Sequence, residues 1–348
     1  MTSMHGRMDA VPPGRSGVQA TSPTRDPLPS PGEEVLVRRG AVTLSGFLLT
    51  PDRPGPYPAA VLIHGSGPTS VRAYWRPPAF PFWKDIAEFL VRKGLAVLAF
   101  DKPGVGLSTG DWRVQSFEDR ARDVLAVVEY LASRGDVRAD RIGVVGHSQG
   151  GWIGQRVAAR HPERVAFVVT LAGPAIPVLE QVLDDLETLW RCRGNSAEVA
   201  RWKRRVLALP LRAYAGVGRV WPVGYLARIL HYAPHEDLRR ITQPFLALFA
   251  GNDRLVHPEK NARLLRRYLE ASRSPAWFVG VVPGANHLFR PSDLCETHVE
   301  RRWADGFWDA LDEPRFWRWV LDEQACERER SSTAAGLAGR MRLGDAAR

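Results

Sequence analysis

The segment Gly146–Gly150, with the sequence GHSQG, constrains the fold of this chain more than any other feature. It follows the apolar run Arg141–Val145 and opens a segment with a helical pattern. Glycines at both ends permit a crowded turn between a strand and a helix. Such a turn holds Ser148 exposed, where a neighbouring base can take its proton. A chain with 31 glycines can contain this pattern by chance, so the surrounding segments decide its meaning.

Two apolar runs later in the chain end in the residue types that a nucleophilic serine needs. Pro244–Ala250 is typical of a strand and is followed by Asp253, and Trp277–Val282 is typical of a later strand and leads to His287. Ser148 would attack an acyl carbonyl and His287 would accept its proton. Asp253 would orient the imidazole and stabilise its charged form. The three residues therefore predict a catalytic triad.

The order Ser148, Asp253, His287 differs from the orders found in chymotrypsin and subtilisin. With the GHSQG turn, this order makes the chain resemble serine hydrolases of the α/β-hydrolase superfamily over about residues 34–323. The resemblance implies an α/β-hydrolase fold, with a mostly parallel central sheet flanked by helices and a helical cap insertion. Within the superfamily, the chain looks most like bacterial esterases with an HGSGP loop.

The HGSGP loop is His64–Pro68, which follows the buried strand expected at Tyr57–Ile63. In the superfamily, a loop at this place supplies one backbone N–H of the oxyanion hole, and the residue after the nucleophile supplies the other. The resemblance assigns these donors to Ser66, or a neighbouring glycine, and to Gln149. A plain loop between a strand and a helix is the alternative.

Other residues remain candidates for the acid and the base. Glu259 and Asp293 lie within a few residues of Asp253 or His287 and could supply the acid instead. His64 and His147 lie within the motifs and are expected to be structural. Three histidines in polar stretches are expected to be solvated, namely His231, His235 and His257.

A glycine-rich loop, Asp101–Ser108, directly follows the strand expected at Leu95–Phe100. Many bacterial esterases of the superfamily carry a similar loop at this place. It lacks the glycine spacings that cradle a pyrophosphate. We therefore expect a structural turn that braces the active-site face, not a cofactor site.

The pattern along the chain predicts one catalytic domain with an insertion. Residues 1–32 are expected to be a disordered tail without the apolar stretch of a signal peptide. Residues 33–174 and 241–325 are expected to form the core, 175–240 a helical cap, and 326–348 a flexible tail. Helices are expected at Ser116–Ala132 with a cap pairing to Asp119, at Gly150–Arg160, at Val178–Trp190 and at Ala197–Leu209.

Aromatic residues of the cap and of the segment after the HGSGP loop could line an acyl pocket or pack as core. They are Trp190, Trp202, Trp221 and Tyr225 with Leu230 in the cap, and Trp75, Phe80, Phe82 and Trp83 after the loop. Basic residues of the cap could face an anionic substrate or form a solvated helix face; these are Arg201, Lys203, Arg204 and Arg205.

Composition narrows the class of protein further. The three cysteines, Cys192, Cys295 and Cys326, are widely spaced and lack metal-ligand spacing, which favours free thiols in a reducing cytoplasm. The formal net charge of +10 is spread along the chain without an aromatic-rich platform, so we expect no nucleic-acid partner. No apolar run is long enough to span a membrane. Neither a metal nor a cofactor is expected.

The sequence thus favours a cytoplasmic hydrolase of a carboxylic ester that acts through an acyl-Ser148 intermediate on a small-molecule acyl substrate. An acyltransferase or thioesterase with the same triad is the first alternative. A silent binding module of the same fold is the second, and the complete triad argues against it. The oligomeric state is left open.

Overall fold

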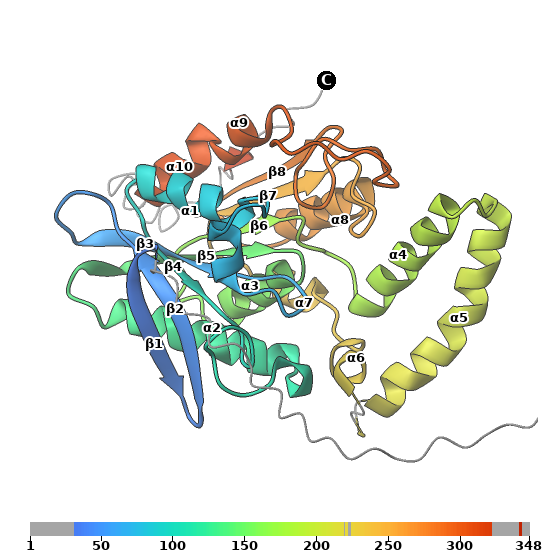
Figure 1. Cartoon of the computed structure of the whole chain (residues 1–348), viewed down its shortest axis with the longest axis horizontal. Coiled ribbons are helices and arrows are strands. Elements are labelled where there is room, and N and C mark those ends of the chain that lie inside the picture. The colour runs from blue at the N-terminus through green and yellow to red at the C-terminus, as the bar shows by residue number, and fades with distance from the viewer. Residues whose placement is uncertain (1–30, 219, 222–223, 322–340, 343–348) are drawn as a thin grey trace, which may run out of the picture. The chain divides into compact units, whose positions relative to one another are not determined.

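The computed structural model describes residues 31–218, 220–221, 224–321 and 341–342. Figure 1 shows the chain. The strands are β1 (Glu33–Arg39), β2 (Val42–Leu49), β3 (Tyr57–Ile63), β4 (Ala96–Phe100), β5 (Val137–His147), β6 (Val168–Leu171), β7 (Phe245–Ala250), β8 (Ala276–Val282) and β9 (Met341–Arg342). The helices are η1 (Val71–Trp75), α1 (Phe82–Arg92), η2 (Trp112–Val114), α2 (Phe117–Ala132), α3 (Gln149–Arg160), α4 (Val178–Cys192), α5 (Ala197–Gly218), α6 (Gly224–Ile229), α7 (His235–Arg239), α8 (Pro258–Glu270), α9 (Phe307–Leu311) and α10 (Pro314–Leu321).

The strands form one sheet in the order β1-β2-β4-β3-β5-β6-β7-β8-β9. β1 and β2 pair antiparallel, as do β2 and β4, whereas every pair from β4 through β9 is parallel. In a parallel sheet the loops after the strands gather at one edge, which is where such folds bind ligands. The predicted α/β fold with a mostly parallel sheet is therefore confirmed, and the loops after β3, β5, β7 and β8 share that edge.

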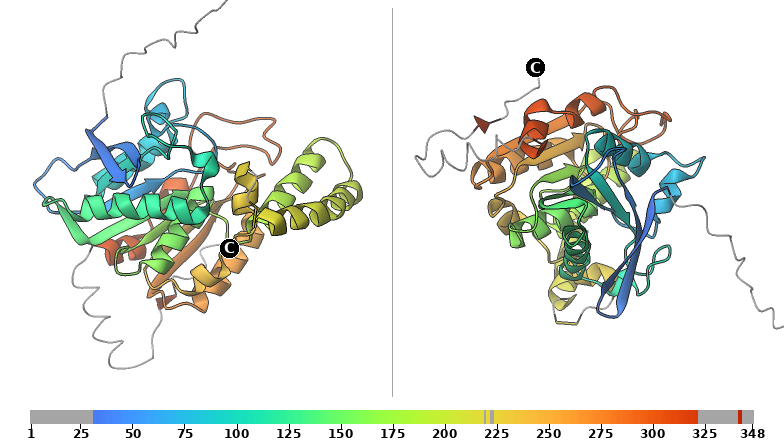
Figure 2. Two further views of the ribbon diagram at one scale, coloured as in Figure 1. Left: turned by 90° about the horizontal axis from the view of Figure 1, so that it is seen from below. Right: turned by 90° about the vertical axis from the view of Figure 1, so that its left-hand side faces the viewer.

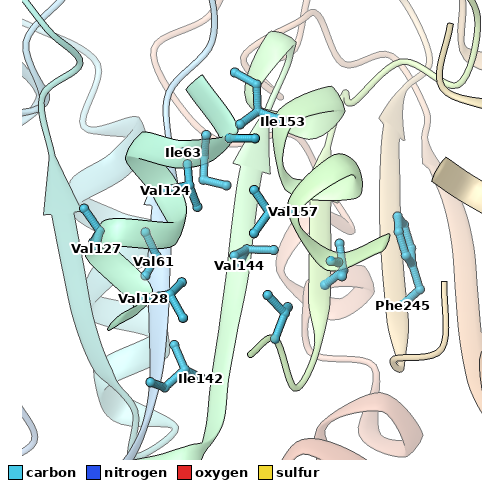
Figure 3. Close-up of a cluster of buried hydrophobic side chains, with 14 of the residues drawn as sticks. Val61, Ile63, Val124, Val127, Val128, Ile142, Val144, Ile153, Val157 and Phe245 are labelled. Atoms are coloured by element: carbon cyan, nitrogen blue, oxygen red, sulfur yellow. The ribbon is translucent and has the colours of Figure 1, made fainter. Parts of the chain in front are cut away.

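Side chains of successive strand residues alternate between two buried clusters, one on each face of the sheet. Val61 and Ile63 of β3 pack with Val124 of α2 and Ile153 of α3 on one face, as Figure 3 shows. On the other face, Leu62 packs in a cluster with residues of α1, α9 and α10. Helices thus cover both faces. β7 is buried along its whole length, and β5 is buried from Ile142 to His147, where it approaches the site.

The expected helix at Ser116–Ala132 is present as α2, which begins at Phe117 after Ser116 as its N-cap. The Ser116 hydroxyl accepts from the backbone N–H of Asp119, and the Asp119 carboxylate accepts from that of Ser116. This reciprocal pair satisfies two of the donors that a helix start leaves unpaired. The predicted cap pairing is confirmed.

Regular structure between β6 and β7 is helical, comprising α4, α5, α6 and α7. Both α4 and α5 extend beyond the predicted stretches, to Cys192 and Gly218. Figure 1 and Figure 2 show α4 and α5 as a hairpin of helices. We refer to Val178–Arg239 as the helical segment.

The prediction of free thiols was wrong, because Cys192 and Cys295 form a disulfide with a Cα–Cα distance of 5.4 Å. The two residues are 103 positions apart, so sequence spacing gave no sign of their proximity. Closing a loop of this size stabilises a fold by about 4–5 kcal/mol in the chain-entropy account. Because disulfides persist in oxidising compartments, the argument for a cytoplasmic location no longer stands. Cys326 lies outside the described residues.

The predicted N-terminal tail lies almost wholly outside the described residues. Of the predicted C-terminal tail, the structure describes only Met341–Arg342, which pairs with Ala276–Trp277 of β8 as β9. No helix within the described ranges is long and apolar enough to cross a bilayer.

Candidate active site

Ser148 lies between the end of β5 and the start of α3, as its sequence context predicts. Its backbone has φ 54° and ψ −123°, a conformation that residues other than glycine rarely adopt. A Cβ on Gly146 would collide with the carbonyl of Gly150, and one on Gly150 would collide with that of Ile63. Only glycines fit this turn, and the strained conformation holds Ser148 at the strand edge.

Asp253 and His287 are brought together from the loops after β7 and β8. Nδ1–H of His287 donates to Oδ2 of Asp253 over 2.7 Å. Oδ1 of the same carboxylate accepts from the backbone N–H groups of Leu255 and Val256, at 2.8 and 2.9 Å. The Asp253 side chain is fully buried, whereas that of His287 is 12% exposed. The carboxylate is thus bonded on both oxygens, and it fixes the orientation of the imidazole.

His147 connects the histidine loop to the turn that carries Ser148. Nε2–H of His147 donates to the backbone carbonyl of His287 over 2.9 Å, and the two rings lie 4.7 Å apart. Burial and the neighbouring His287 lower the pKa of His147 to about 3. His147 is therefore neutral and has the structural role that was predicted for it. Because His147 directly precedes Ser148, its hydrogen bond ties the loop of His287 to the turn that carries Ser148.

The HGSGP loop lies against Ser148. A Cβ on Gly65 would come within 3.1 Å of the Ser148 Cβ, so the loop backbone approaches Ser148 closely. Ser66 is exposed. Gln149 begins α3, and the first N–H groups of a helix have no acceptor within it. Both predicted oxyanion donors thus belong to backbone segments that adjoin Ser148.

Lys102, which sequence reasoning did not single out, holds the HGSGP loop in place. Its buried ammonium donates to the carbonyls of Gly65 and Gly67, at 2.7 and 2.5 Å. Burial and the nearby Arg120 lower the pKa of Lys102 to about 7, although Asp101 opposes the shift. No periodicity or spacing distinguishes this lysine from those on the surface, so only the folded chain reveals it.

The rest of the Asp101–Ser108 loop has the bracing role that was predicted. The Asp101 carboxylate accepts from the Ser70 hydroxyl over 2.7 Å and from the Val71 backbone N–H over 2.6 Å. The Ser108 hydroxyl donates to the Asp101 carbonyl and accepts from the backbone N–H of Ser45. Burial raises the pKa of Asp101. The loop ties β2, β4 and the segment after the HGSGP loop together.

The helical segment reaches the site at two points. The Tyr225 hydroxyl of α6 donates to Oε1 of Gln149 over 2.7 Å, and burial raises the pKa of Tyr225 to about 12. Asp185 of α4 pairs with Arg254 over 2.6 Å. Burial raises the pKa of Asp185, with Arg254 opposing and Asp253 adding to the shift. Asp185 therefore lies in the electrostatic environment of the acid–histidine pair, which the sequence did not indicate.

The alternative acids have other surroundings than the His287 ring. Glu259 is exposed on α8. Asp293 is exposed and accepts from Cys295, Thr297 and His298 within its own loop. Among the residues that the structure describes, only Asp253 is hydrogen-bonded to the His287 ring.

The remaining histidines divide between structural and surface positions. His64 is buried, and burial followed by Lys102 lowers its pKa well below the usual value. His257 was expected to be solvated, but its ring is hydrogen-bonded to Thr188 of α4 over 3.0 Å. His231 is exposed and His235 half-buried.

Of the aromatic residues that could line a pocket or pack as core, two pack in the core and two are exposed. Phe82 packs behind the elbow against His147, and Trp83 packs against His64. Trp202 and Trp221 are exposed. Three of the four basic residues considered on α5 bind neighbours: Arg201 pairs with Glu198, Lys203 with Asn195, and Arg204 with Asp184 and Glu187. The fourth, Arg205, is exposed.

Within the described ranges, no group of three or more His, Cys, Asp or Glu residues is placed to hold a metal ion.

The chain is similar to known hydrolases. Esterase EstD of Thermotoga maritima is 29% identical over 264 residues, which cover 74% of this chain and 60% of that protein. The 2,6-dihydropseudooxynicotine hydrolase of Paenarthrobacter nicotinovorans is 24% identical over 238 residues, or 65% of this chain and 60% of that protein. The chain thus spans less than two thirds of the length of either relative.

A solved structure shows the same fold. Est1E from Butyrivibrio proteoclasticus with bound ferulic acid matches 84% of this chain and 99% of its own, with a TM-score of 0.52 and 15% sequence identity. A model of the alpha/beta hydrolase family matches residues 60–297. Because this match spans more than half of the sequence, the chain belongs to the alpha/beta hydrolase family.

Proposed function

We propose that this protein hydrolyses a carboxylic ester through an acyl-Ser148 intermediate. The observation that carries the proposal is the 2.7 Å hydrogen bond between His287 and Asp253. Ser148, held at positive φ on the turn after β5, supplies the nucleophile. The similarity to the esterase of Thermotoga maritima supports ester cleavage.

The proposed reaction uses the three side chains in sequence. Oγ of Ser148 attacks the acyl carbonyl while Nε2 of His287 takes its proton, and the charged imidazole then protonates the leaving alkoxide. Water attacks the acyl-enzyme by the reverse proton path and releases the acid. Asp253 stabilises the imidazolium and fixes the tautomer that accepts the proton.

Backbone N–H groups of Ser66 and Gln149 are the proposed oxyanion donors. In a trans peptide the C=O and the N–H point in opposite directions. Because Lys102 holds the carbonyl of Gly65, the N–H of Ser66 in the same peptide is turned away from the lysine. Lys102 is therefore a positioning residue for the oxyanion hole. We also propose that residues 175–240 act as a cap, because Tyr225 and Asp185 reach the site from it.

A serine-directed fluorophosphonate tests the nucleophile. We expect the reagent to label Ser148, as located by peptide mass spectrometry, because the neighbouring base activates the hydroxyl. Labelling should be lost in His287→Ala and retained in His231→Ala, which removes an exposed imidazole. Labelling of another serine, or equal labelling of both variants, would contradict the proposal.

Lys102→Met is expected to lower kcat about 10- to 100-fold with little change in KM. Removing an oxyanion donor costs about 100- to 1,000-fold, and here the donor remains but loses its support. The Lys102 pKa of about 7 lies below its usual value, so the proton leaves as the pH rises through 7. Its charge-assisted hydrogen bonds then weaken, and the wild-type kcat should decline several-fold on the alkaline side.

The pH profile of kcat separates this role from a loss of stability. The alkaline decline should be absent from Lys102→Met and unchanged in Lys84→Met, which removes a lysine paired with Glu88 on the surface. The groups that set the charge around Lys102 are Arg120 and Asp101. Wild-type kcat and pH profile in Lys102→Met would show that the lysine does not position the loop.

A further inference from the structure

Helix α5 exposes a row of large apolar side chains. Most of them recur every three or four residues, the spacing that places side chains on one face of a helix. Trp202 is 62% exposed and Leu209 is 73% exposed. Soluble proteins rarely leave a contiguous apolar surface uncovered, and such surfaces mark interaction sites. The row, called the outer stripe below, consists of Val199, Trp202, Val206, Leu209, Val217 and, just beyond the helix, Val220.

The other side of α5 packs on α4. Ala200 and Ala208 are buried there. Arg204 of α5 pairs with Asp184 of α4 over 2.7 Å, and Lys260 of α8 pairs with the same carboxylate over 2.6 Å. In Figure 1, α4 accordingly lies between α8 and α5. The outer stripe therefore faces away from α4 and away from the acid–histidine pair, so it does not form part of the site described above.

Basic side chains border the outer stripe. Arg205 and Arg212 are exposed beside it. The only acidic residue of α5 is Glu198, which already pairs with Arg201. A helix with an apolar face that includes tryptophan, bordered by arginine and lysine, is typical of helices that lie in the interface between membrane and water. The partner of the stripe must then be both apolar and anionic.

A second copy of the chain fits this surface poorly. Self-association through a twofold axis would place the arginines of both chains in one interface, and the chain already has a formal net charge of +10. An anionic bilayer offers acyl chains to the stripe and phosphates to its border. We propose that the outer stripe docks α5 on the surface of an anionic lipid bilayer. With its 22 residues, α5 would extend about 33 Å along that surface.

Vesicle flotation with the purified full-length chain tests the proposal. We expect binding to phosphatidylcholine vesicles with about 30 mol% phosphatidylglycerol, little binding to pure phosphatidylcholine, and weaker binding at high salt. Leu209→Glu should weaken binding at least about tenfold, because it places a carboxylate in the acyl region. Leu36→Glu is the matched control, since Leu36 is 66% exposed on β1, and it should bind as the wild type does.

Fluorophosphonate labelling and the oligomeric state in solution are measured for the same variants to keep the outcomes distinct. Fluorophosphonate labelling should be equal in both variants, since the stripe lies apart from Ser148, and equal labelling shows that Leu209→Glu is folded. Wild-type protein that does not float with anionic vesicles would overturn the proposal, as would equal binding by the two variants. A dimer that Leu209→Glu dissociates, in the absence of lipid binding, would assign the stripe to self-association instead.

Discussion

Ser148→Ala is expected to lower kcat for ester hydrolysis about a million-fold, because the nucleophile and its base act as a unit. The remaining rate above that of water would come from the oxyanion donors and from substrate binding. The Ser148 side chain makes no hydrogen bond at the start of α3, so its removal leaves the described helix contacts intact. Hydrolysis of a p-nitrophenyl ester and a thermal melt measure the two effects.

The control for this variant is Ser133→Ala, which removes an exposed hydroxyl at the end of α2. It should leave kcat unchanged. The double variant Ser148→Ala, His287→Ala should be no slower than Ser148→Ala alone, because the base has no proton to take once Oγ is gone. Residual activity in Ser148→Ala above about one per cent of wild type would assign catalysis to another nucleophile.

The fold and the chain positions of the proposed triad could be predicted because local signals and tertiary structure agree. Tyr57–Ile63 is the strand predicted from its apolar run. The GHSQG pattern predicted a crowded turn, and backbone atoms indeed leave no room for a Cβ at Gly146 or Gly150. Ser148, Asp253 and His287 each follow a strand of a parallel sheet, so one edge gathers them. Consistency between local sequence and global fold made these inferences possible.

What the sequence did not indicate depends on contacts between distant segments. Lys102 reaches carbonyls 35 and 37 positions away, and nothing local distinguishes it from a solvated lysine. The partner of Cys192 lies 103 positions later. The wrong prediction of free thiols arose because spacing rules describe short motifs, whereas this bridge joins the end of α4 to the loop after His287. The outer stripe could not be predicted either, because its recognition depends on which side chains of α5 are exposed.

The second large decrease in kcat is expected when the proposed acid, Asp253, is replaced. Asp253→Asn should lower kcat about 10,000-fold, less than the loss of Ser148, because the geometry survives but the imidazole tautomer is wrong. Oδ1 of Asp253 accepts from two backbone N–H groups, so the amide oxygen of asparagine should take that position. Its NH₂ group then faces Nδ1 of His287 and makes that nitrogen an acceptor. The proton moves to Nε2, which can no longer receive one from Ser148.

Asp293→Asn and Asp185→Asn make this prediction specific to one carboxylate. Asp293 is bonded within its own loop, so its variant should retain nearly full activity. Asp185 pairs with Arg254, whereas Nδ1 of His287 is hydrogen-bonded to Asp253, so the Asp185 variant should lose far less than Asp253→Asn. A loss in either control equal to that of Asp253→Asn would move the acid to another residue. The tautomer itself can be followed by the imidazole nitrogen resonances of His287, which should exchange their assignments in Asp253→Asn.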